Sequence, residues 1–198
     1  MLVRAAATSD CHNIAILHAA SWRYAYRGAL RDEYLAGDVE SDRRQLWESR
    51  LAEPTERQRV LLVEEGGHLL GFACVYVDED PQWGSYLNNI HVVRATQGRG
   101  IGRFLLHATA EVCGKSRSQG LYLWVLQSNT NAQGFYARHG GENTGTDVWE
   151  APGGTTAPLF RFSWESVLRL WEATANPSIE RTSSSVLRTL PAAAHVKR

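Results

Sequence analysis

The sequence lacks an excess of charge of either sign, because 21 lysine and arginine side chains balance 21 aspartate and glutamate side chains. Its three cysteines, Cys11, Cys74 and Cys113, lie in separate apolar segments, without the spacing of a disulfide framework or a zinc site. No apolar run approaches the roughly 18 residues of a membrane-spanning helix, and the N-terminus has no signal-peptide core. These absences argue against nucleic acid, a membrane or a metal as partners. They favour a cytoplasmic protein with buried free thiols.

What is present is the composition of a globular protein, with 198 residues of which 43% are hydrophobic. This length suits one catalytic or binding domain, which we expect over residues 1–165. Residues 166–198 are expected to form a short helix and then a flexible, mildly basic tail. From Asn176 onward the tail is rich in Pro, Ser, Thr and Arg, a composition that does not bury a core.

Hydrophobic periodicity predicts an α/β protein with a mixed sheet of about seven strands. In the first half, a short strand is followed by mainly helical segments and then by three strands that form an antiparallel meander. The strands are expected at Leu2–Ala7, Arg59–Glu65, Leu69–Val77 and Ser85–Val93, with a turn at Asp78–Pro81; the helical segments reach from Ile14 to Arg27 and over Arg31–Leu35 and Asp42–Leu51.

The second half alternates helices and strands. A glycine turn leads into a helix from Phe104 to Val112, and the apolar run Leu121–Leu126 is typical of a strand covered on both faces. A helical segment, Asn129–His139, ends at two glycines, and Glu142–Glu150 with Ala157–Trp164 predicts a terminal hairpin. The crossover through the first of these helices predicts two parallel neighbouring strands.

The glycine turn, Gln97 to Arg103, is the most informative segment. Unpaired amides and the helix dipole favour an anion such as phosphate where a strand leads into a helix. The turn is neither a Walker A loop, which ends in Gly-Lys-Ser/Thr, nor a dinucleotide fingerprint, because Arg103 stands where its last glycine belongs. Gln97, Gly100 and Gly102 fit Gln-x-x-Gly-x-Gly, in which missing Cβ atoms let a pyrophosphate approach the main chain. A helix entrance that merely needs flexible residues is the alternative.

A second motif follows the next strand, with Asn129, Ala132, Phe135, Tyr136 and Gly140 in the pattern Asn-x-x-Ala-x-x-Phe-Tyr-x-x-x-Gly. Together with the glycine turn, this resembles the GNAT superfamily of acyl-CoA-dependent N-acyltransferases, over roughly Leu2 to Trp164. The resemblance implies a mostly antiparallel seven-stranded sheet with a V-shaped splay between the fourth and fifth strands.

The resemblance also implies acetyl-CoA as cosubstrate, without a metal. Main-chain amides of the splayed strand would hold the pantetheine arm, and those of the turn would hold the pyrophosphate; two arginines would lie at the rim or face solvent. Asn129 would orient the cofactor or only cap its helix. The implied cofactor-binding residues are Ile90, His91, Val92, Gln97, Gly98, Arg99, Gly100, Ile101, Gly102, Arg103, Asn129 and Tyr136.

For catalysis, Tyr136 is the expected general acid, since a phenol stays protonated at neutral pH and can donate to a departing thiolate; a packed core aromatic is the alternative.

The sequence departs from the family pattern at the general base, because Tyr86 and Asn88 occupy the positions where many relatives carry Glu or His. His91 has the opposite strand parity and would face the site only if a bulge reverses the alternation. The other routes are a water held by Tyr86 and Asn88, or the acidic turn at Asp78–Asp80.

The acceptor is expected to be a small-molecule amine or a peptide N-terminus that attacks the thioester directly. Aromatic side chains of the first helices and the terminal hairpin suit such a substrate, although they are also ordinary core residues. The expected substrate-binding residues are Trp22, Tyr24, Tyr26, Tyr34 and Tyr86, with Trp149 and the Pro152–Thr156 loop nearby. Two alternatives remain: a non-catalytic acyl-CoA-binding regulatory module, and a partner-binding protein that acts through its basic tail. A homodimer is also left open, because dimers are common in the family.

Overall fold

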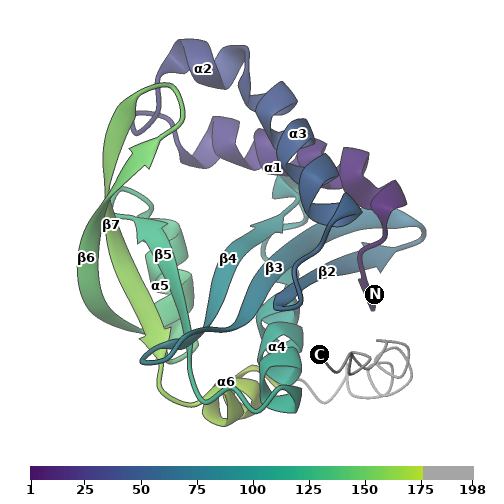
Figure 1. Ribbon diagram of the computed structural model, residues 1–198, viewed down its shortest axis with the longest axis vertical. Coiled ribbons are helices and arrows are strands. Elements are labelled where there is room, and N and C mark those ends of the chain that lie inside the picture. Colours follow the sequence, from purple (N-terminus) through teal and green to yellow (C-terminus); the bar gives the residue numbers. More distant parts are fainter. Residues whose placement is uncertain (176–198) are drawn as a thin grey trace, which may run out of the picture.

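The computed structural model describes residues 1–175 and has the expected mixed α/β architecture (Figure 1). The predicted tail over 176–198 lies outside the described residues. The helices are α1 (Cys11–Ala25), α2 (Asp32–Ala36), α3 (Val39–Ala52), α4 (Ile101–Lys115), α5 (Thr130–Arg138) and α6 (Val167–Thr174), with short 3-10 turns at Thr8–Asp10 and Arg94–Thr96. The strands are β1 (Leu2–Ala5), β2 (Gln58–Glu65), β3 (His68–Asp80), β4 (Gly84–Val92), β5 (Leu121–Leu126), β6 (Glu142–Ala151) and β7 (Thr155–Trp164).

The strands form one seven-stranded sheet in the order β1-β2-β3-β4-β5-β7-β6, antiparallel except for β4 and β5. These two parallel strands pair only at Ser85 with Leu121 and at Tyr86 with Tyr122. Beyond these pairs the two halves of the sheet diverge, as Figure 1 shows. The mostly antiparallel sheet and the splay between the fourth and fifth strands are therefore confirmed.

Each face of the sheet is covered by its own helices. On one face, α4 packs its apolar stripe on β2, β3 and β4, and buried residues of β5 and α6 complete this main core. On the other face, α1 and α3 cover a second cluster that includes Trp47 and Phe72. Strand alternation separates the two, because Leu61 and Val63 face α4 whereas their neighbour Leu62 faces α1 and α3.

One turn differs from its prediction. The acidic segment expected to be a turn continues β3 as far as Asp80, which pairs with Gly84 at the start of β4. Gly84 has a φ of 81°, and a Cβ there would lie 2.3 Å from the carbonyl oxygen of Gly120. Glycine therefore permits the close approach that holds the β3–β4 turn against the start of β5.

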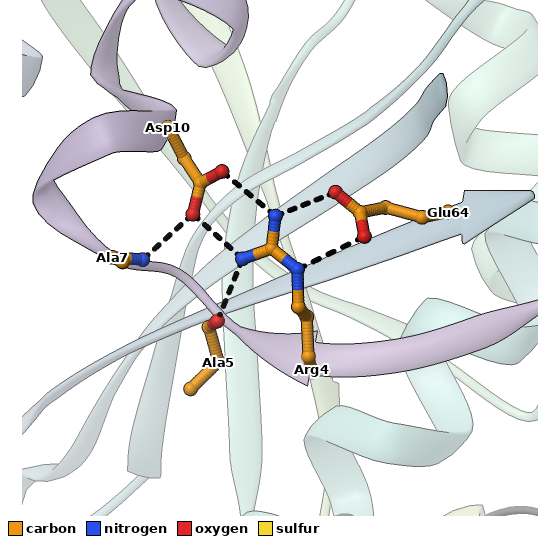
Figure 2. Close-up of polar contacts among 5 residues, drawn as sticks. All are labelled: Arg4, Ala5, Ala7, Asp10 and Glu64. Carbon is orange, nitrogen blue, oxygen red and sulfur yellow. Dashed lines mark hydrogen bonds and ion pairs between the residues drawn. The ribbon is translucent and has the colours of Figure 1, made fainter. Parts of the chain in front are cut away.

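A polar network ties the N-terminal strand to the sheet (Figure 2). The Arg4 guanidinium donates to both carboxylate oxygens of Asp10 at 2.7 Å, and its Nε donates to Glu64 on β2 at 2.9 Å. Asp10 also accepts a hydrogen bond from the amide of Ala7 at 2.7 Å. The Arg4 hydrogen bonds hold the pKa of the Asp10 carboxyl below its ordinary value. The network thus anchors the strand just before α1 begins.

The three cysteines are free, with Cys74 and Cys113 buried and Cys11 partly exposed. Over the described range, no helix combines the length and the apolar character needed to cross a membrane.

Candidate acyl-transfer site

The splay between β4 and β5 opens into a cleft with a volume of about 1030 Å³. Tyr86 and Asn88 of β4 line it from the face that α1 and α3 cover, and Asn88 donates to the Tyr86 hydroxyl at 3.2 Å. Opposite them, Trp124 and Leu126 of β5 line the cleft. The two strands that separate thus leave a space bounded by polar and aromatic side chains.

Aromatic side chains from distant segments form another wall of the cleft. Trp22 and Tyr26 of α1 stack with ring centroids 4.9 Å apart, and Trp149 of β6 meets Trp22 edge to face at 5.6 Å. Residues four apart on a helix share a face, which explains why Trp22 and Tyr26 lie together. Burial raises the pKa of Tyr26 to about 12, so this phenol stays neutral.

The predicted glycine turn lies between β4 and α4. Gly98 and Gly100 each have a φ of 81°, and a Cβ at either position would meet open space. Among the described residues, no acceptor bonds to the amides of Gly98, Gly100 or residues 101–103. A cluster of free amides at the positive end of a helix suits a phosphate group, and this fits the pyrophosphate of coenzyme A.

Gly102 also has a packing role that the motif alone did not predict. A Cβ at this position would lie 3.3 Å from the ring of Phe135 on α5. The missing side chain therefore lets α5 pack against the first turn of α4, while the amide of Gly102 stays among the free amides of the turn. Phe135, a residue of the second motif, thus packs against the glycine turn, which is the first motif.

The other predicted residues around the turn divide into two groups. Arg99 is engaged with Glu65 at 2.6 Å on the surface, whereas Arg103 has no ionic partner within the described part of the chain. Gln97 is exposed. Asn129 accepts a hydrogen bond from the amide of Ala132 at 3.1 Å, so of its two predicted roles the structure shows the helix cap.

The free edge of β4 offers main-chain amides toward the splay. The amide of Val93 donates to Leu70 on β3. Because amides alternate in direction along an antiparallel pair, the amide of His91 also faces β3, and those of Ile90 and Val92 face away from it. Of the three predicted pantetheine-binding amides, Ile90 and Val92 are thus available, and that of His91 is not.

Tyr136 lies on α5, where it packs between Phe162 and Trp164 and is 7% exposed. No hydrogen bond reaches its hydroxyl from the described residues, and this oxygen is not among the fully enclosed unpaired atoms. Burial raises the pKa of Tyr136, and the Tyr26 phenol adds to the effect. A packed ring with a free, protonated hydroxyl is compatible with both of its predicted roles, core aromatic and proton donor.

His91 faces the cleft side of the sheet because β4 contains a bulge. Asn89 pairs with Cys74 and Leu87 with Val75, which leaves Asn88 as an extra residue. The bulge reverses the alternation, so His91 lies beneath α1 with its ring 4.6 Å from that of His18. Burial lowers the pKa of His91 to about 4. The imidazole is therefore neutral at neutral pH and too weak a base to retain a proton from an ammonium group.

Two predicted substrate residues do not line the cleft. Tyr24 is 50% exposed, and Arg94 lies over its ring at 3.9 Å. Tyr34 is buried against the α1–α3 helices, where its hydroxyl donates to Asp42 at 2.7 Å. For Tyr24 the correction follows from helix geometry, which turns its side chain away from the face of α1 that carries Trp22. Tyr34 lies on α2, where it packs in the same buried cluster as Trp22 without lining the cleft.

The acidic turn is also absent from the cleft lining. Glu79 lies 3.8 Å from Arg57, and Asp80 accepts hydrogen bonds from the amides of Gln82 and Trp83. Glu79 and Asp80 thus interact locally. Because the turn does not line the cleft, its carboxylates are not placed to accept a proton from an amine bound there.

Four charged residues of the cleft were not predicted. Arg43 and Arg50 line it from α3, and Asp147 and Glu150 line it from β6. Arg43 and Arg50 are seven residues apart, which places both on one face of α3. The sequence contained this signal. Nothing local identifies that face as the one above the cleft, because β4 and β6 reach it only through the tertiary fold.

Comparison with known proteins identifies the arrangement. A family model described as the acetyltransferase (GNAT) family matches residues 17–141. The chain is 27% identical over 111 residues to a putative [ribosomal protein bS18]-alanine N-acetyltransferase of Bacillus subtilis, and this match covers 56% of the chain but just under two thirds, 66%, of that relative. It is 28% identical over 153 residues to the uncharacterized N-acetyltransferase YuaI of the same organism, which covers 76% of the chain and 86% of YuaI.

A solved structure has the same fold. The PaiA N-acetyltransferase of Thermoplasma acidophilum, in complex with coenzyme A, matches with a TM-score of 0.63 and 16% identity. The match covers 82% of the chain and 98% of that protein.

Proposed function

The chain belongs to the GNAT family of N-acetyltransferases, and from this premise we propose that it transfers an acetyl group from acetyl-CoA to a primary amine by direct attack. The observation that carries the proposal is the course of β4, which lines the cleft at Tyr86 and Asn88, separates from β5 beyond Tyr86, and leads through the glycine turn to the unpaired amides at the start of α4. When bound, acetyl-CoA supplies an activated thioester; the residues of the chain bind and orient the reactants and move the protons.

The cosubstrate would be held mainly by the main chain. The amides of Gly98, Gly100 and the first turn of α4 would bind the pyrophosphate, with Arg103 at the rim. The amides of Ile90 and Val92 would hydrogen-bond the pantetheine arm and polarise the acyl carbonyl. Support comes from the coenzyme A complex of the structurally similar Thermoplasma acidophilum protein, which has the same fold.

Tyr136 would act as the general acid. Acyl transfer to an amine ends with the protonation of a thiolate, and a buried phenol with a raised pKa remains protonated throughout the neutral range. Its hydroxyl is free to form a new hydrogen bond. The free hydroxyl is the feature that favours the proton-donor role, because the raised pKa is equally expected of a packed core phenol.

The amine must lose a proton before it attacks, and a water would receive it. Tyr86 and Asn88 are hydrogen-bonded to one another in the cleft and could position this water. His91 does not line the cleft, and its lowered pKa makes it a weak base, so it would not receive this proton directly. The proton would then leave through the cleft to solvent.

The acceptor class includes small amines and protein N-termini. One relative is named as a putative N-acetyltransferase of an alanine of ribosomal protein bS18, and the aromatic wall formed by Trp22, Tyr26 and Trp149 would suit either kind of amine. A non-catalytic acyl-CoA-binding module gains no support from these relatives.

The proposal is tested by titrating acetyl-CoA into the protein by calorimetry. We expect micromolar binding by the wild type and its loss in Gly100→Asp, which places a negative charge beside the free amides. The matched control is Gly28→Asp, since Gly28 has a similar φ of 78°, equally open surroundings and a position between α1 and α2. A folded wild type that binds no acetyl-CoA, or equal binding by Gly100→Asp, would contradict the proposal.

A further inference from the structure

Two arginines of α3, Arg43 and Arg50, line the cleft without an ionic partner among residues 1–175. Neighbouring arginines differ in this respect, because Arg23 and Arg44 both lie within 4 Å of Glu40, at 3.4 and 3.7 Å. The protein therefore pairs the outer arginines of these helices with Glu40, whereas the two in the cleft form no salt bridge, and Arg43 has only Tyr34 and the neighbouring Asp42 to favour its charge.

Arg43 is the more unusual of the two. Its guanidinium lies over the Trp22 ring at 4.1 Å, and its Nε is enclosed without a hydrogen-bond acceptor. Burial lowers the pKa of Arg43. Buried donors in folded proteins are nearly always satisfied, so an enclosed, unpaired Nε on a guanidinium that lines a cleft points to an acceptor that arrives with a ligand.

Arg50 is fixed at the β4 bulge. Its Nη1 donates to the side-chain oxygens of Asn88 and Asn89, at 2.9 and 3.0 Å. Within the described chain its other guanidinium nitrogens form no hydrogen bond. The bulge thus orients a cation beside the residues proposed to hold the water, with donors left for a ligand.

The opposite wall of the cleft carries the opposite charge. Both Asp147 and Glu150 belong to the segment of β6 that lines the cleft, but strand alternation turns only Asp147 to the side that carries Trp149, across from Arg43 and Arg50 of α3. A ligand with an amine and a carboxylate matches this arrangement, whereas Asp147 would disfavour a ligand that carries several negative charges.

We propose that the acceptor is an amine that also carries a carboxylate, which Arg43 binds with the help of Arg50. This inference rests on the proposed acetyl transfer and specifies its substrate. The planar guanidinium presents paired N–H donors that match the two oxygens of a carboxylate, and stacking on Trp22 holds the plane in place. The amine then remains free to reach the splay.

The test measures acetyl transfer to pairs of acceptors that differ only in a carboxylate or its carboxamide. One set consists of free amino acids and their amides, and the other of short peptides with glutamate or glutamine as the second residue. We expect the wild type to prefer the carboxylate in kcat/KM in one of these sets, which identifies the source. Arg43→Met is expected to lower this preference about 10- to 100-fold. Comparing preferences cancels differences in amine reactivity.

Two variants control for charge and shape. Arg44→Met removes the same charge at the next position, where the side chain pairs with Glu40, and should keep the preference. Arg43→Lys keeps the charge without the planar fork and should give an intermediate preference. An unchanged preference in Arg43→Met, or an equal loss in Arg44→Met, would overturn the inference.

Failure of acetyl transfer itself would look different, because no acceptor of either set would react. In that case N-acetyl amino acids and their amides are titrated into the wild type and into Arg43→Met. The fluorescence of Trp22 and Trp149 in the cleft provides the signal. Tighter binding of the carboxylate form by the wild type, lost in Arg43→Met, would support the inference. Equal binding of both forms, or no binding, would overturn it.

Discussion

Arg4 and Arg43 are both partly buried arginines, yet their surroundings are opposite. Arg4 donates to Asp10 and Glu64 from all three nitrogens of its guanidinium, in a network internal to the protein (Figure 2). Arg43 lies over Trp22 in the cleft, forms no salt bridge among the described residues, and has an enclosed Nε without an acceptor. The first arrangement stabilises the fold, and the second is suited to a ligand.

The same contrast extends to other groups. The Asn129 side chain is used inside the protein as a helix cap, whereas the Tyr136 hydroxyl and the amides of Gly98, Gly100 and residues 101–103 have no partner among residues 1–175. Removing an internally paired group should therefore lower stability and spare activity. Removing an unpaired group of the site should do the reverse.

The largest effect is expected for Tyr136→Phe. Loss of the general acid should lower kcat by about 100-fold or more, because proton donation to the leaving thiolate disappears. The free energy of unfolding should change little, since no internal hydrogen bond is lost. Steady-state assays of thiol release measure the first quantity, and urea denaturation measures the second. Tyr24→Phe, at an exposed tyrosine outside the cleft, is the control; a Tyr136→Phe variant with wild-type kcat would refute the assignment.

Next in size is the stability loss of Arg4→Met. It leaves the Asp10 and Glu64 carboxylates, 13% and 20% exposed, without their cation. We expect the free energy of unfolding to fall by about 2–3 kcal/mol, as for a partly buried ion pair that loses one partner. Urea denaturation measures the change, with the exposed Arg44→Met as reference. A loss no larger than that of Arg44→Met would remove the contrast between the two regions.

A pH titration of stability sharpens the role of the network. The pKa of Asp10 is lowered in the folded protein, so its stabilising effect is present above the unfolded pKa of about 3.9 and is lost as the pH falls through the folded pKa. The contribution to the slope is at most about 1.4 kcal/mol per pH unit. Arg4→Met should lose stability less steeply than the wild type below about pH 4. Parallel curves for the two proteins would show that Asp10 is not coupled to Arg4.

The smallest effect is expected for the stability of Arg43→Met. Arg43 forms no ion pair within residues 1–175 and is partly desolvated. The variant should therefore change the free energy of unfolding by less than about 1 kcal/mol, and we expect the change to be an increase. The urea midpoint and slope provide the measurement. A loss comparable with that of Arg4→Met would mean that Arg43 is structural.

The order of the elements could be predicted from local patterns. Glycine pairs, apolar alternation and the glycine turn identified the hairpins, the parallel crossover and α4, with boundaries within a few residues. Helical periodicity could also have separated Trp22 and Tyr26 from Tyr24, since successive residues turn by about 100°. That error arose from reading the three aromatics as one group.

The side-chain chemistry of the cleft was less accessible. The bulge at Asn88 reverses the orientation of His91, yet neither residue nor its neighbours carries a sequence signal for it. Arg43 and Asp147 lie about 100 residues apart in the sequence and share the cleft only because the hairpin β6–β7 follows β5 in the sheet. The main-chain amides of the candidate site could be predicted from the spacing of glycines in the turn. The side chains that line the cleft could not, because long-range packing brings them together.

The most direct test compares acetyl transfer by Arg4→Met and Arg43→Met under conditions in which both are folded, with the acceptor whose carboxylate the wild type prefers. The account predicts wild-type kcat/KM for Arg4→Met and a reduction of about 10- to 100-fold for Arg43→Met. Equal activity of the two variants would contradict the claim that the protein keeps one arginine for its fold and the other for its substrate.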